Sequence, residues 1–326
     1  MAAPGKVTLA NLATWGAKNA NPVDLTLAQE TIVIDQFTQQ IPVSFVNGTE
    51  NRYRREVTRV PVVPHHVGGT VCEGVGSFTP VTDQVGRLLA QIPLDKKIQA
   101  ASNNVSQIRD QLQSTAWELA EKLGYYMING NGGTTSSDGE IKGLKILSDA
   151  LPATQWYLPA TSAAGVALQL IHLDKIRKLV KYPIDFYLMH SDLYIDYKDL
   201  AMAMGGNALG EVQRPFASFA GGSVVIQDRG VPAYDGIPIY TSDHIQTESC
   251  YGNPLKHRIY AGSFQQSKGL EMFFDPSNTT MGIQVDPVHT KEGSDEDFWR
   301  VRDMKGLSLR STLSLSYGSN FKITNS

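Results

Sequence analysis

The stretch from Ser102 to Asn129, SNNVSQIRDQLQSTAWELAEKLGYYMIN, is the feature that most constrains the fold of this chain. Its apolar residues recur at steps of three and four, which places them along one stripe of an α-helix. About 25 residues at 1.5 Å each make a rod of roughly 38 Å, and such a rod needs a partner surface of similar length. The stripe consists of Val105, Ile108, Leu112, Ala116, Leu119, Leu123 and Tyr126 or Met127.

Both ends of this helix carry boundary signals. Asn104 and Gln107, three residues apart, match a capping pair at its start. Gly130, Gly132 and Gly133 follow its end and predict positive φ angles at a C-terminal cap. In a phosphate-binding loop the glycines precede a helix N-terminus, so these glycines do not indicate nucleotide binding.

The composition is that of an ordered globular protein. Of the 326 residues, 41% are hydrophobic and 19% charged, and the net charge of −3 argues against a protein that coats nucleic acid by overall charge. Cys72 and Cys250 are too few for a disulfide framework, and free thiols are expected. An apolar run of about 18 residues and the features of a signal peptide are both missing, so we expect folding in the cytoplasm without a membrane.

The chain before the helix divides into two parts. Residues 1–45 show one helix candidate, over 20–40, and otherwise read as an extended arm or, equally well, as a flexible terminus. Residues 46–98 contain β-forming residues over 52–60, then a tract rich in Pro and Gly, then a second strand-like run over 81–94. This pattern predicts a long β-hairpin that has little to bury by itself and lies against another subunit.

The chain after the helix predicts two further units. Residues 155–283 alternate short apolar strands with amphipathic helices and indicate a compact α/β unit. Over 304–318, leucines alternate with Ser, Arg and Thr, which predicts one strand with a single buried face. Residues 281–326 are therefore expected to supply the partner surface of the long helix. The helix candidate over 168–183 is expected to direct inward Leu168, Ile171, Ile176, Leu179 and Val180.

Two groupings suggest chemistry, and each has a simpler explanation. His190-Ser191-Asp192 contains the residue types of a hydrolase triad, but side chains this close in sequence rarely reach that geometry, and no G-x-S-x-G motif occurs. A strand end followed by a helix cap explains these residues better. The adjacent pair His65-His66 lacks the i, i+4 spacing of zinc-binding helices. We therefore expect no catalytic residue, no metal and no cofactor.

Other charged residues are expected to serve contacts between subunits. The four arginines of the hairpin could contact phosphate, but there is little aromatic interleaving, and an acidic surface on a neighbouring subunit serves equally well. Three acidic residues near the C-terminus lack the spacing of a calcium loop, so a solvated turn or an intersubunit salt bridge is expected. The candidate intersubunit residues are Arg52, Arg54, Arg55, Arg59, Asp295, Glu296 and Asp297.

Several stretches also have a familiar order and spacing. They are RYRREVTRVPVV with GVGSFTPVTDQVGRLLAQIPLDKKIQA, then AWELAEKLGYYMINGNG with IKGLKIL, then DGIPIYTSD and RIYAGSFQQ, and last SDEDFWRVRDMKGLSLRSTLSLSYGSNF. In this order they resemble the extended loop, the spine helix, the axial-domain strands, and the peripheral-domain tip and last strand of one family. That family is the major capsid proteins of tailed bacteriophages, whose fold is shared with encapsulins. The resemblance runs over nearly the whole chain from about residue 30.

The resemblance implies an α+β capsid fold in four parts. These are an N-terminal arm (1–45), an extended β-hairpin loop (46–98), a peripheral domain with spine helix and β-ribbon (99–154 and 284–326) and an α/β axial domain (155–283). It implies a major capsid protein, not an enzyme, that assembles as hexamers and pentamers into an icosahedral shell around double-stranded DNA without sequence-specific contact. The loop would lie over an adjacent subunit, and residues 295–297 would sit where three capsomers meet.

Two departures from the family bear on partners. Residues 52–94 contain no Lys, so the isopeptide cross-link of some relatives is not expected. There is no long N-terminal helical segment of the kind that some relatives use as a built-in scaffold. A separate scaffolding protein is therefore expected, with a portal and a possible decoration protein. The protein is expected in the virion capsid, after assembly in the host cytoplasm.

Three other classes compete with this interpretation. The first is an encapsulin-like shell of a cellular compartment. The second is an enzyme, either a hydrolase centred on Ser191 or a metal enzyme using His65 and His66. The third is a tail-tube protein, which would lack a long spine helix.

Overall fold

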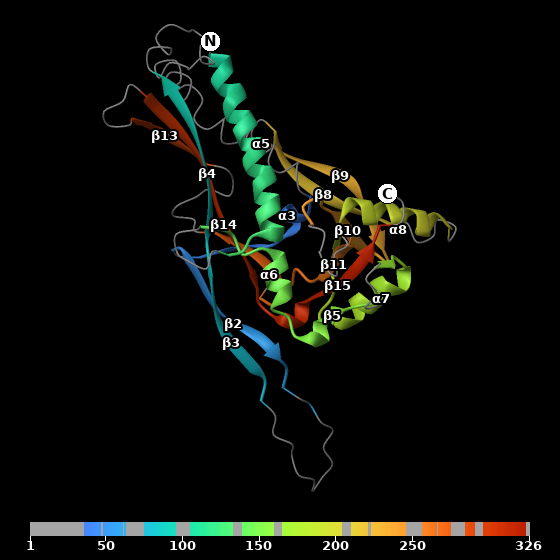
Figure 1. Ribbon diagram of the computed structural model, residues 1–326. Coiled ribbons are helices and arrows are strands. Elements are labelled where there is room, and N and C mark those ends of the chain that lie inside the picture. The colour runs from blue at the N-terminus through green and yellow to red at the C-terminus, as the bar shows by residue number, and fades with distance from the viewer. Residues whose placement is uncertain are drawn as a thin grey trace.

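The computed structural model combines one long helix, shorter helices and β-sheets, and Figure 1 shows their arrangement. It describes residues 36–46, 48–60, 62, 75–95, 105–132, 139–159, 165–203, 210–220, 223–245, 256–265, 267–274, 284–290 and 296–323. Within these ranges, the backbone alone is described for residues 36, 39, 93–95, 105–113, 210–220, 223–231, 284–290 and 296–297.

An eight-stranded sheet forms one body of the molecule. Its strands are β5 (Trp156–Tyr157), β6 (Val166–Ala167), β7 (Phe186–Met189), β8 (Gly210–Ala220), β9 (Ser223–Tyr234), β10 (Ile237–Thr241), β11 (Lys256–Gly262) and β15 (Leu315–Lys322). Their order is β5-β15-β11-β7-β10-β9-β8, with β6 beside β15. β7 is one of the short apolar strands expected within 155–283, and it is buried along its length between the parallel β10 and the antiparallel β11.

Two helices pack on this sheet, α7 (Leu170–Leu179) and α8 (Ser191–Ala203). The predicted inward stripe of α7 is confirmed at Leu168, Ile176 and Val180, but it is wrong at Ile171, whose side chain is 53% exposed. The reason is geometric. Ile171 lies two residues before the fully buried Leu173, which is about 200° around the helix from it.

A five-stranded sheet forms the second body. Its strands are β1 (Val43–Phe45), β4 (Gly86–Asp95), β12 (Leu270–Phe274), β13 (Gln284–Thr290) and β14 (Glu296–Leu309). The order is β1-β12-β14-β13, and β4 also pairs with β14. β4 runs antiparallel to β14 from the pair Asp95 and Glu296 to the pair Gly86 and Lys305.

The predicted long helix is confirmed as α5 (Val105–Asn129), 25 residues in length. It packs along β4 and β14, so its partner surface is only partly the one expected from 281–326. Where side chains are described, the predicted stripe is buried, at Ala116, Leu119, Leu123 and Met127. The side chains of the first part of the stripe, before residue 114, and the capping residue Asn104 lie outside what the structure describes.

The glycines after α5 serve close packing more than positive φ. Gly132 has the expected positive φ, at 74°, but Gly130 does not, and Gly133 lies outside the described residues. A Cβ on Gly130 would lie 2.1 Å from the carbonyl oxygen of Ile141. The segment after α5 thus pairs with the one at 141–143, where Gly143 donates its N–H to Gly130 O at 2.8 Å.

One hydrophobic core joins the two sheets. It includes side chains from α3 (Gln36–Gln40), α5 and α6 (Leu144–Asp149), together with residues of both sheets. Phe37, for example, packs edge-on against Phe186 of the larger sheet, with 5.0 Å between ring centroids. Of the helix candidate over 20–40, the described part is helical, and the rest lies outside the described residues.

The C-terminal chain differs from the single strand predicted over 304–318. β14 ends at Leu309, a 3₁₀ turn covers Thr312–Ser314, and β15 then enters the eight-stranded sheet beside β11. Conversely, β12 lies in the five-stranded sheet. Each sheet therefore contains a strand from the other side of the expected domain boundary at 283/284. In the part of the chain that the structure describes, no helix is long and apolar enough to cross a membrane.

The predicted hairpin is divided between a two-stranded ribbon and the five-stranded sheet. β2 (Glu50–Thr58) and β3 (Ser77–Gln84) form a two-stranded ribbon, and the register pairs Arg52 with Thr82 and Arg54 with Pro80. The return run over 81–94 was expected to be one strand, but it breaks at Val85 and continues as β4 in the five-stranded sheet. The ribbon is thus tied to the core sheet through its own second strand.

Candidate assembly surface

The β2–β3 ribbon extends away from both sheets, as Figure 1 shows. Side chains alternate between its two faces with the period of a strand. Asn51, Tyr53 and Arg55 are buried against the body, while Arg52 and Arg54 are exposed. The four hairpin arginines singled out from the sequence therefore do not share one role.

Tyr53 is at the centre of the contact between the ribbon and the body. Its hydroxyl lies 2.7 Å from Asp83 Oδ2 and 3.1 Å from Leu309 O, close enough to donate a hydrogen bond to either. Burial, together with the negative charge of Asp83, raises the pKa of Tyr53 well above its ordinary value, so the hydroxyl stays protonated. Lys142 Nζ lies 3.0 Å from Asp83 Oδ1 and balances the charge of this buried carboxylate.

Arg55 contributes to the same contact between the ribbon and the body. Its Nε donates to Leu309 O at 2.9 Å, and a terminal nitrogen donates to the Tyr53 hydroxyl at 3.1 Å. The side chain is buried, with the residue only 8% exposed. The guanidinium of Arg310 lies over the Tyr53 ring, 4.5 Å from its centre.

Glu56 fastens the ribbon one residue further along. Its Oε2 accepts hydrogen bonds from the Tyr182 hydroxyl, from Ser311 Oγ at 3.2 Å and from Lys268 Nζ at 3.4 Å. Its backbone N–H donates to Arg310 O at 3.0 Å. Burial alone would raise the pKa of Glu56, but the hydrogen bonds from Tyr182 and Ser311 and the charge of Lys268 outweigh it and lower that pKa below its ordinary value.

Arg59 follows the end of β2 and also contacts its own chain. Its guanidinium lies 4.3 Å from the centre of the Tyr182 ring, and one of its nitrogens lies 3.4 Å from Lys181 O. Tyr182 thus contacts the ribbon at two points, through Glu56 and through Arg59. These contacts fix the direction in which the ribbon leaves the body.

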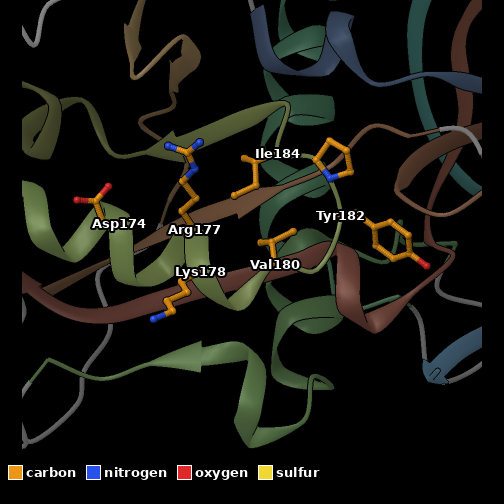
Figure 2. Close-up of a pocket in the computed structure, with 7 residues that line it drawn as sticks. Asp174, Arg177, Lys178, Val180, Tyr182 and Ile184 are labelled. Atoms are coloured by element: carbon orange, nitrogen blue, oxygen red, sulfur yellow. The ribbon is translucent and has the colours of Figure 1, made fainter. Parts of the chain in front are cut away.

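Tyr182 also borders a hollow of about 390 Å³ between α7 and the segment that follows it (Figure 2). Asp174, Arg177 and Lys178 of α7 line one side of this hollow, and Val180, Tyr182, Pro183 and Ile184 line the rest. Arg177 forms an ion pair with Asp235, which raises the pKa of the guanidinium. Among the described residues that line the hollow there is no histidine, serine or cysteine.

The outward face of the ribbon is open. Arg52 bonds to Glu50 at 2.7 Å on the surface, and Arg54 is exposed beside it. Toward the end of the ribbon, four apolar side chains are largely exposed. They are Val60 at 55%, Val62 at 94%, Val75 at 90% and Phe78 at 55%. A projecting ribbon with exposed cations at its base and exposed apolar groups toward its end is a surface suited to contact with another protein.

The acidic residues named as candidates for intersubunit contacts lie elsewhere. Glu296 and Asp297 begin β14, with their backbones opposite Asp95 and Leu94 of β4, and Asp295 lies outside the described residues. Figure 1 shows this start of β14 and the β2–β3 ribbon at opposite ends of the molecule. A contact between the two sets would therefore join different copies of the chain.

The residues of the hydrolase alternative do not form a nucleophile–base pair. Ser191 Oγ donates to Asp243, and His190 Nδ1 accepts the N–H of Asp192 at 3.2 Å, in the manner of a helix cap. The expected strand end and cap are thus confirmed. His65, His66, Cys72 and Cys250 lie outside the described residues.

Sequence reasoning missed Tyr53, Glu56 and Asp83, which carry the contact between ribbon and body. A usable signal was present for Tyr53, because strict alternation along β2 puts it on the same face as Arg55. For Asp83 and Glu56 there was none, since their partners Lys142, Ser311 and Lys268 lie far away in the sequence.

A long helix on a sheet that continues into a projecting ribbon, joined to an α/β body, defines the capsid fold shared by tailed phages and encapsulins. The encapsulin SrpI from Synechococcus elongatus PCC 7942 superposes with a TM-score of 0.63 at 18% identity, over 98% of each chain. The capsid of a native GTA particle gives a TM-score of 0.57 at 12% identity, over 87% of this chain and 89% of that one. Cyanophage A-1(L) capsid gives 0.55 at 13% identity, over 93% and 95%. No protein-family model and no curated protein matches the sequence.

Proposed function

We propose that this chain is the major capsid protein of a tailed phage, a structural protein and not an enzyme. Its copies would assemble as hexamers and pentamers into an icosahedral shell that encloses double-stranded DNA. The fold supports this proposal, because capsid proteins resemble the chain over about nine tenths of its length. A fold alone does not define a function, so the argument rests on the surface that this chain presents.

The β2–β3 ribbon is the observation that carries the proposal. A two-stranded ribbon is marginal in water by itself, yet the base of this one is held by buried, hydrogen-bonded charges. The contacts at this base hold the otherwise unsupported ribbon in one direction. The opposite face exposes Arg52 and Arg54, and the residues toward the end of the ribbon expose apolar side chains. In a shell a neighbouring subunit would cover these surfaces.

Charge complementarity suggests which surface of the neighbour is involved. The ribbon arginines and the acidic residues Glu296 and Asp297 lie at opposite ends of the subunit, which suits a head-to-tail contact repeated from subunit to subunit. We infer that Arg52 and Arg54 belong to such contacts. Arg55 and Arg59, which contact their own chain, would act indirectly by holding the ribbon in place.

The remaining partners follow from the same proposal. Double-stranded DNA would be enclosed without sequence-specific contact, in keeping with a chain of net charge −3. A scaffolding protein would guide assembly, a portal would occupy one vertex, and a decoration protein could reinforce the shell. The protein would then reside in the virion, after assembly in the host cytoplasm.

The encapsulin likeness supports a second candidate, the shell of a cellular compartment. Because the two classes share a fold, the contents of the particle distinguish them. The test is to isolate native particles and to measure the nucleic acid and protein that they contain. Packaged double-stranded DNA supports the phage capsid, an enclosed enzyme without DNA supports the compartment, and a soluble monomer contradicts both.

A further inference from the structure

A buried histidine lies beside the N-terminus of α8. His257, in β11, is only 2% exposed, and within the described part of the chain neither of its ring nitrogens has a hydrogen-bond partner of ordinary geometry. A buried polar group left unsatisfied lowers stability, so its retention calls for an explanation. The ring stacks on that of His190, with centroids 4.2 Å apart and planes at 25°.

The register of the sheet brings these residues together. β11 and β7 are antiparallel, and Tyr260 faces Leu188. The residue after the end of β7 therefore comes beside the start of β11, although His190 and His257 are far apart in sequence. Asp192, in the first turn of α8, adds a carboxylate, and its Oδ2 lies 3.4 Å from His190 Nδ1.

The three side chains together form a donor set for a metal ion. One ligand atom from each of His190, Asp192 and His257 lies within 4.8 Å of the other two. Two imidazoles and one carboxylate are ligands that Zn²⁺ accepts, and an ion bound by three protein ligands keeps a fourth position open. Asp192 is the most exposed of the three, with 48% of its side chain accessible, which leaves that position a route to solvent.

We propose that His190, Asp192 and His257 bind a divalent transition metal ion of the zinc class. This site is independent of the shell function, and its role would be to tie α8 to the strands beneath it.

The experiment is zinc binding by the full chain. Protein treated with a chelator is equilibrated with Zn²⁺, dialysed, and its zinc measured by mass spectrometry. Co²⁺ replaces Zn²⁺ as a spectroscopic probe, because its visible absorption reports nitrogen and oxygen ligands. The variants are Asp192→Asn, which removes an exposed carboxylate, and His257→Gln. Asp243→Asn is the control, a carboxylate beside the same helix start that bonds to Ser191 and lies outside the donor set.

We expect one zinc per chain in the wild type and in Asp243→Asn. The affinity should fall at least about 10-fold in Asp192→Asn and in His257→Gln, with loss of the cobalt absorption. If His257→Gln does not fold, as judged by circular dichroism, Asp192→Asn decides. The proposal is overturned if the wild type retains no zinc, or if Asp192→Asn binds zinc and cobalt as the wild type does.

Discussion

The carboxylate of Glu56 accepts a hydrogen bond from the hydroxyl of Tyr182, and this bond joins the projecting ribbon to the segment that follows α7. Tyr182 also lies under the guanidinium of Arg59, so one aromatic side chain contacts the ribbon twice. Glu56 is nearly buried and takes further hydrogen bonds from Ser311 and Lys268. The direction of the ribbon is therefore set by contacts within the subunit, before any neighbour is present.

Replacing Glu56 with Ala should destabilise the base of the ribbon. The change removes the carboxylate that accepts from the Tyr182 hydroxyl, the Lys268 ammonium and Ser311, at an expected cost of about 2–3 kcal/mol in the free energy of unfolding. Denaturant unfolding measures this, and hydrogen exchange should show faster exchange of the β2 amides. In the control Glu50→Ala, which removes only the surface pair with Arg52, the loss should stay below about 1 kcal/mol. Equal losses in both variants would contradict the proposed anchor.

The contribution of Glu56 should depend on pH in a defined direction. Its pKa in the folded protein lies below the ordinary value of 4.5, so the unfolded chain binds the proton more readily. The ionised carboxylate therefore adds stability above pH 4.5, and this addition is lost as the pH falls through the folded pKa. The difference in unfolding free energy between wild type and Glu56→Gln should be largest near pH 6 and should shrink toward pH 3. A difference that grows with acidification would contradict the assignment.

Charge reversals on the two faces of β2 should have different effects. Arg54→Glu and Arg52→Glu change exposed side chains, so they should weaken shell assembly and leave the subunit folded. Arg55→Glu places a carboxylate beside Leu309 O and the Tyr53 hydroxyl, and should lower the unfolding free energy by about 3 kcal/mol or more. Thermal unfolding and sedimentation separate the two effects. Normal particles from the double variant Arg52→Glu, Arg54→Glu would argue against the intersubunit role of these residues.

Gly130→Ala should test the packing at the end of α5. The added Cβ would lie 2.1 Å from Ile141 O and 2.6 Å from Tyr126 O, so the backbone must move. We expect a loss of about 2 kcal/mol or more in unfolding free energy, measured with denaturant. Ser114→Ala, at an exposed position of the same helix, serves as the control and should change stability by less than about 0.5 kcal/mol. Equal stability of the two variants would contradict the close approach of Gly130 to Ile141.

Local periodicity was sufficient to predict the long helix, β7 and the start of α8. Their signals lie within one element, as in the spacing of Ala116, Leu119 and Leu123. It failed over 304–318 for an identifiable reason. Leu307, Leu309, Leu313 and Leu315 all occupy odd positions, so the alternation stays in phase across the 3₁₀ turn where the chain changes sheets. A period of two contains no information about which sheet a strand joins.

The roles of the site residues could be predicted only where the alternation along a strand places them on different faces. Alternation along β2 distinguishes Arg54 from Arg55, but only the folded chain shows that Arg55 bonds to Leu309. The triplet from His190 to Asp192 was correctly interpreted as a strand end and a helix start, although the capping acceptor is His190. The approach of His257, by contrast, depends on the pairing of β7 with β11. Contacts of this kind are set by topology, which a single sequence does not specify.

The central claim is that the outward face of the β2–β3 ribbon is covered by a neighbouring subunit in a closed shell. The most direct measurement is a cryo-electron microscopy reconstruction of the assembled protein. We predict shells built from hexamers and pentamers, with each ribbon lying across the adjacent subunit and with Arg52 and Arg54 at that contact. A protein that remains monomeric, or a shell in which this face of the ribbon stays exposed to solvent, would contradict the account.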